Sequence, residues 1–70
     1  MKYVYVIEQA DDGSFSAYVP DLPGCTTSGD SVEEVRRNIK DAVDSYLESL
    51  RDHNEPVPSP RSVVDVVDAA

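Results

Sequence analysis

The chain has 70 residues, 14 of them acidic and 6 basic, which gives a formal net charge of -8. A domain of this size gains only roughly 3–5 kcal/mol of stability from its core, so self-association is expected. The single cysteine excludes an intramolecular disulfide. Binding to nucleic acid through its phosphates needs clustered Lys and Arg, which this chain lacks. A membrane span needs roughly 20 apolar residues in a row, and no such run occurs, so a cytoplasmic protein is expected.

The first third of the chain predicts antiparallel strands. Residues Lys2 to Glu8 alternate aromatic and β-branched side chains, which is typical of a strand. Asp12-Gly13 is a hairpin signal, and Ser14 to Val19 follows with one apolar and one mostly polar face. Pro20 to Gly24 interrupts the pairing, and a short third strand is expected at Cys25 to Thr27.

A long amphipathic helix follows. Ser31 and Glu34 have the spacing of a capping box, and Asn54 and Pro56 are expected to end the helix. Between these signals the apolar residues recur at the helical period, in the order Val32, Val35, Ile39, Ala42, Val43, Tyr46, Leu47 and Leu50.

The last apolar segment, Ser62 to Asp68, predicts a final strand after a stiff proline-rich linker. The expected fold is therefore of the α+β class with the order β-β-β-α-β, an antiparallel sheet with one helix on one face, in a single domain of residues 1–70. One helix covers only one face, and an uncovered apolar face usually marks an interface. We expect a homodimer or higher oligomer whose interface includes Tyr3, Tyr5, Val64 and Val66.

Nothing in the sequence indicates catalysis. His53 is interpreted as a residue at the helix C-terminus, Cys25 as a small loop residue, and Asp11 and Asp12 as hairpin residues. There is no nucleotide-binding or nucleophile-elbow motif and no cluster with metal-ligand spacing. We expect no enzyme activity, no cofactor and no metal.

The segment YVPDLPGC at the end of the second strand, followed by TTSGDSVEEV leading into the helix, resembles the HicB antitoxin family over nearly the whole chain. The resemblance implies a partial RNase H-like fold and a function in binding and occluding a small basic HicA-type toxin that cleaves RNA. The net charge of -8 suits such a partner, although acidity also serves solubility. The first strand has no acid before Glu8, so no catalytic carboxylate of an RNase H is visible.

Many proteins of this family continue into a DNA-binding segment, whereas only Ala69 and Ala70 follow Asp68 here. No C-terminal DNA-binding domain and no direct DNA binding are expected of this chain. The alternative function is a free-standing homo-oligomeric module that binds nucleic acid or a small ligand without a toxin partner.

The loop around Leu22 has two interpretations. In one, Leu22 folds back as a lid over the helix stripe; in the other, the loop presents its side chains to the toxin or to a second subunit. The second interpretation gives the candidate partner-binding residues Tyr18, Asp21, Leu22, Pro23 and Gly24.

Overall fold

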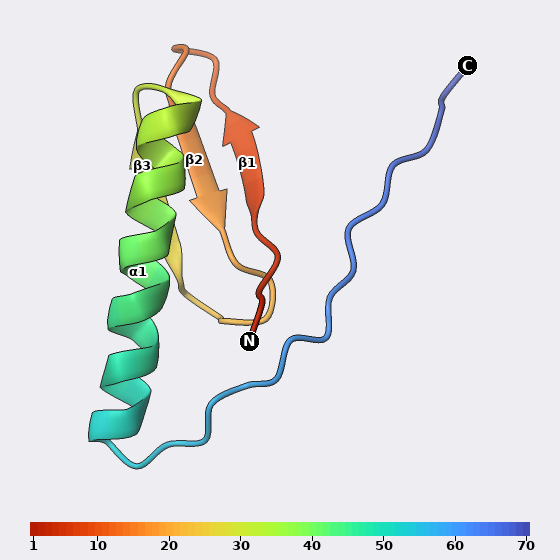
Figure 1. Cartoon of the computed structure of the whole chain (residues 1–70). Helices are drawn as coiled ribbons and strands as arrows, with labels where there is room; N and C mark the ends of the chain where they lie inside the picture. The colour runs from red at the N-terminus through yellow and green to blue at the C-terminus, as the bar shows by residue number, and fades with distance from the viewer.

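A computed structural model describes residues 1–70 and shows a three-stranded sheet with one long helix beside it (Figure 1). The elements are β1 (Val6–Gln9), β2 (Phe15–Tyr18), β3 (Thr26–Gly29) and α1 (Val32–Asp52). The sheet order is β1-β2-β3 and both pairings are antiparallel. The predicted α+β class, with an antiparallel sheet and one helix, is confirmed.

Strand β1 is shorter than predicted because its partner strand runs into a proline. Val6 pairs with Tyr18, so the register would place Val4 opposite Pro20. Proline has no backbone N–H, and the ladder cannot continue through it. Residues 2–5 therefore lie outside the strand, and β1 begins at Val6 instead of Lys2.

The two faces of the sheet differ as the alternation predicts. Ala17 is buried and Phe15 packs against the core, whereas Ser16 and Tyr18 are exposed. Ile7 pairs with Ala17, so it lies on the same face of the sheet. The alternation carries Tyr3 and Tyr5 to this helix side, and the outer face remains uncovered by any helix.

Both ends of α1 are capped. The Glu34 backbone N–H donates to Ser31 Oγ at 3.2 Å, as the capping box predicts. The Glu34 carboxylate, however, accepts from the Asp30 N–H at 3.3 Å instead of from Ser31. A Cβ on Gly29 would lie 2.9 Å from Glu34 Oε1, so the absence of that atom leaves space for the carboxylate to reach past the cap.

The C-terminus of α1 has the hydrogen bonds of a Schellman motif. Asn54 has a φ of 55° and donates to the Arg51 carbonyl at 3.1 Å, and Glu55 donates to the Leu50 carbonyl at 2.8 Å. Asparagine tolerates this left-handed conformation better than most residues. The prediction that Asn54 ends the helix is confirmed, and His53 is the C-cap residue.

The core is small and lies between the helix and the inner face of the sheet. It consists of six buried residues, which are Ala17, Val19, Leu22, Cys25, Val35 and Ile39. No charged or polar residue is buried. The helix is also too polar along its length to cross a membrane.

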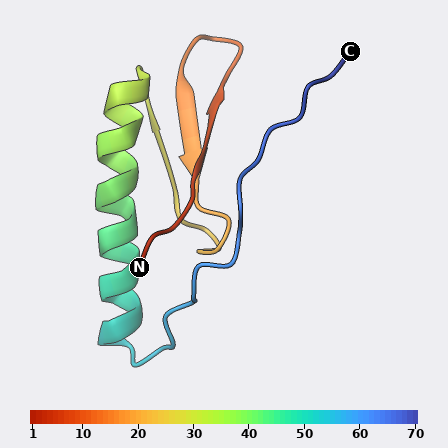
Figure 2. The ribbon, with the colours of Figure 1, turned by 45° about the vertical axis from the view of Figure 1, so that its right-hand side comes forward.

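The predicted final strand is absent, and this part of the β-β-β-α-β order was wrong. Residues 56–70 are extended but have no ladder partner, and the sheet ends with three strands. The chain after α1 crosses beneath the sheet and then leads away from β1, as the two views show (Figures 1 and 2). An extended segment becomes part of a sheet only when a neighbouring strand pairs with its backbone N–H and C=O groups, whatever its β propensity.

Candidate functional site

The proline loop, residues 20–24, is held to the core by Leu22. The Leu22 side chain is fully buried. Its N–H donates to the Val19 carbonyl at 3.1 Å, and its own carbonyl accepts from the Cys25 N–H at 3.0 Å. Tyr46 on α1 donates its hydroxyl to the Pro23 carbonyl at 3.0 Å. These contacts agree with the interpretation in which Leu22 folds back over the apolar stripe of the helix. Its buried side chain anchors the loop to the core.

Asp21, in the same loop, binds the C-terminal segment 40 residues further along the chain. Its Oδ2 accepts the backbone N–H of Arg61 at 2.9 Å and that of Ser62 at 3.0 Å. Its Oδ1 accepts the Ser62 hydroxyl at 2.8 Å. The hydrogen bonds from Ser62 and then Arg61 lower the pKa of the Asp21 carboxyl below its usual range. We call this contact the Asp21 latch.

Tyr18 stands on the outer face of the sheet, beside the proline loop. Its side chain is 41% exposed and belongs to the middle strand, with Val6 on one side and Thr26 on the other. Pro23 and Gly24, at the tip of the loop, are also exposed. An exposed tyrosine on a rigid strand offers a large contact surface at a small loss of rotamer entropy.

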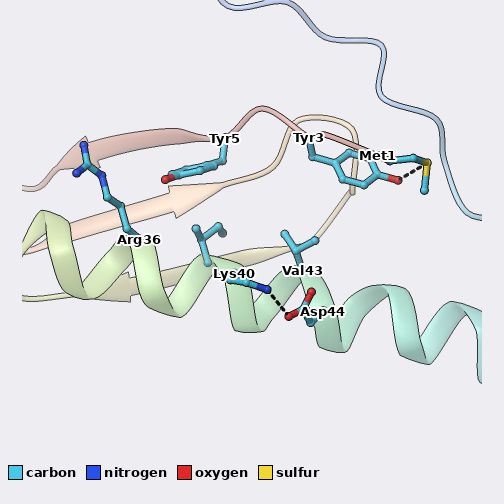
Figure 3. A pocket seen from close by; sticks show the side chains of 8 residues that line it. Met1, Tyr3, Tyr5, Arg36, Lys40, Val43 and Asp44 are labelled. Atoms are coloured by element: carbon cyan, nitrogen blue, oxygen red, sulfur yellow. Dashed lines mark hydrogen bonds and ion pairs between the residues drawn. The ribbon is translucent and has the colours of Figure 1, made fainter.

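An apolar groove of about 270 Å³ lies between the N-terminal residues, which precede β1, and α1 (Figure 3). Tyr3, Tyr5, Ile39 and Val43 supply most of its wall. Arg36, Lys40 and Asp44 form its polar rim, and Lys40 pairs with Asp44 at 3.0 Å. Arg36 forms no ion pair.

Comparison with known proteins identifies the family. A family described as the HicB-like antitoxin of bacterial toxin-antitoxin systems matches residues 3–70. The chain belongs to the HicB-like antitoxin family. A UPF0150 protein of Thermoplasma acidophilum is 47% identical over 83% of this chain and 84% of the relative, and one of Synechocystis is 39% identical over 89% and 78%. A protein named antitoxin HicB 1, from Photorhabdus laumondii, is 33% identical over 90% of this chain but only 41% of its own length.

The residues predicted for the oligomer interface of this HicB-like chain lie in two places. Tyr3 and Tyr5 line the groove, where Tyr3 is half-buried and donates its hydroxyl to the Pro58 carbonyl. Val64 and Val66 lie on the C-terminal segment, and both are exposed. The structure of one chain does not bring these two pairs together.

Cys25 and His53 have the side chains in this HicB-like domain that are most often reactive, and both are held within the fold. Cys25 is buried, and burial raises the pKa of its thiol, which disfavours the nucleophilic thiolate. His53 Nδ1 lies 2.8 Å from the Ser49 carbonyl on the preceding turn. No group of three His, Cys, Asp or Glu residues is arranged to hold a metal ion.

Neither the Asp21 latch nor the groove was predicted from the sequence. One of the two interpretations of the loop presents Asp21 to a partner, and its carboxylate also binds the protein's own Arg61 and Ser62. No local pattern signals a contact between residues 40 apart. The groove needed the helix and the N-terminal residues to be placed together, which no spacing in the sequence indicates.

Proposed function

We propose that this HicB-like protein is an antitoxin that binds a small basic HicA-type RNA-cleaving toxin in the cytoplasm and blocks its active surface. Family membership is the observation that carries the proposal. The antiparallel sheet followed by one helix agrees with the first elements of a partial RNase H-like fold.

The negative charge of the chain supports a positively charged partner. The net charge is -8, and no charged side chain is buried, so the whole excess acts on the surroundings of the molecule. A field of this sign steers basic proteins toward the surface and repels RNA. A toxin that binds RNA must itself present positive charge where its substrate lies.

We place the toxin contact on the outer face of the sheet and the tip of the proline loop. Tyr18 is the central residue of this surface, with Pro23 and Gly24 beside it. Asp21 adds negative charge, although Arg61 and Ser62 already occupy its oxygens. Leu22 contributes by holding the loop in place from the core.

The test begins with a small basic protein that copurifies with the tagged chain from the host, which is then purified alone and assayed for RNA cleavage. We expect the chain to abolish cleavage at a stoichiometric ratio, and higher salt to weaken the complex. Cleavage that continues at saturating chain, or the absence of any complex at low salt, contradicts the proposal.

Two variants locate the surface. Tyr18→Ala is expected to weaken inhibition about tenfold or more, because truncating a central interface tyrosine commonly costs more than about 1.4 kcal/mol. Ser45→Ala, at an exposed position of α1 outside this surface, is the control and should inhibit normally. Equal inhibition by both variants would move the contact away from this face.

A further inference from the structure

The outer face of the sheet, opposite α1, consists of two short rows of side chains that run across the strands (Figure 1). The register aligns Val6, Tyr18 and Thr26 in one row and Glu8, Ser16 and Ser28 in the next. Tyr18 is the one aromatic residue of these rows, and Glu8 is the one charged residue. The two are diagonal neighbours on adjacent strands, a separation of roughly 7–8 Å that long side chains bridge. The outer face therefore places one ring close to one carboxylate.

Glu8 differs from the other acidic residues near Tyr18 because its carboxylate has no partner within the molecule. Asp21 already accepts three hydrogen bonds from the C-terminal segment. At the hairpin, Asp12 accepts the backbone N–H of Ser14 at 2.9 Å and its hydroxyl at 2.6 Å. Glu8 is exposed and forms no ion pair, and neither row contains a cation. The carboxylate of Glu8 is thus available to a group from outside.

The chemistry of the two side chains specifies what that group is. Tyr18 is 41% exposed, and the side chains of Ser16 and Thr26 beside it are too short to cover its ring. The face of an aromatic ring attracts a cation, and a planar guanidinium stacks on it. The same guanidinium offers a fork of N–H donors that matches a carboxylate. A lysine ammonium is a compact point charge and has neither the plane nor the fork, so arginine fits the pair best.

We propose that Tyr18 and Glu8 together bind an arginine side chain of the basic partner. The guanidinium lies against the Tyr18 ring, and its N–H groups donate to the Glu8 carboxylate. This inference rests on the proposed antitoxin function and deepens it, because it names the chemistry by which the outer face recognises its toxin. It also extends the contact from the proline loop along the strands toward the hairpin. A phosphate is not an occupant of this site, because the Glu8 carboxylate repels it.

The test is an NMR titration of the isotope-labelled full chain at low salt, without any toxin. The probe is a short blocked peptide of alternating glycine and arginine, and the matched peptide has lysine at each arginine position. We expect the largest amide shifts at Tyr18, Glu8 and their cross-strand neighbours. The arginine peptide should bind about two- to fivefold more tightly than the lysine peptide. Equal affinities, or shifts centred on α1 instead of the sheet, overturn the proposal.

Variants of the ring separate stacking from apolar contact. Tyr18→Phe keeps the ring and should keep the preference for arginine. Tyr18→Leu keeps an apolar side chain without a ring and should bind the two peptides equally. Because Tyr18 lies outside the core, both variants should retain the native circular dichroism spectrum. A leucine variant that still prefers arginine contradicts the role of the ring.

Variants of the carboxylate separate a specific contact from general attraction to an acidic protein. Glu8→Gln should weaken binding of the arginine peptide about two- to fivefold. Glu48→Gln removes the same charge from an exposed position of α1 and should have a smaller effect. Equal effects of these two variants would show that only net charge attracts the peptide, which overturns the proposal.

The titration and the inhibition assay fail separately. Since no toxin is present in the titration, a negative result there leaves the antitoxin proposal to the assay of RNA cleavage. A chain that binds the arginine peptide through Tyr18 and Glu8 but does not inhibit its copurified partner retains the arginine site and loses the proposed function.

Discussion

At the scale of single residues, Leu22 is the side chain on which the proline loop depends. It is fully buried within a core of only six residues. Leu22→Ala is expected to destabilise the fold by about 2–5 kcal/mol, which is comparable to the whole stability of a domain of this size. Urea unfolding measures the change, and Thr26→Ala, at an exposed strand position, is the control. A loss below about 1 kcal/mol would mean that the loop does not need its anchor.

Asp21 is the second decisive residue, because its carboxylate holds the C-terminal segment at Arg61 and Ser62 by three hydrogen bonds. Its pKa is lower in the latched state than in the free carboxyl, so the latch is complete at neutral pH and is lost as the pH falls through the lowered pKa. Asp21→Ala is expected to speed amide hydrogen exchange at Arg61 and Ser62 at neutral pH, and the difference from the native chain should vanish below the lowered pKa.

Asp21→Asn separates charge from hydrogen bonding. The amide oxygen still accepts a hydrogen bond but does not titrate in acid. Exchange at Ser62 in this variant should be slower than in Asp21→Ala and should show no acid transition. An acid transition that persists in the asparagine variant would assign the release of the C-terminal segment to another group.

At the scale of elements, α1 has a capping signal at each end. Ser31 supplies the cap at its start, and Ser31→Ala should lower the free energy of unfolding by about 0.5–2 kcal/mol. Ser45→Ala, on an exposed middle turn, tests for nonspecific effects and should be neutral or slightly stabilising. Denaturant titration of both variants checks this, and equal effects would show that the cap contributes nothing.

At the scale of the whole molecule, the core has only six buried residues, so we expect association of two or more copies to add to the stability of the fold. Dilution of such an assembly shifts the equilibrium toward the unfolded chain. The melting temperature is then expected to rise by a few degrees for each tenfold increase in protein concentration. A native chain that melts at the same temperature at every concentration contradicts the prediction.

The elements that the sequence determined by itself are those made by neighbours along the chain. The helix follows from its caps and its apolar period, and its start at Ser31 and its end at Asn54 were both predicted. The alternation in β2 predicted correctly that Ala17 lies inside and Tyr18 outside. Turn chemistry and side-chain periodicity act over a few residues, so they can be read without the fold.

The tertiary structure alone decided what depends on distant residues. Residues 62–68 have the composition of a strand, but a strand needs a partner and the chain provides none. Leu22 had two interpretations until the helix was placed beside the loop, and Asp21 met Ser62 only through the path of the whole chain. Burial and long-range hydrogen bonds are properties of the packed molecule, because they require segments far apart in sequence to meet in space.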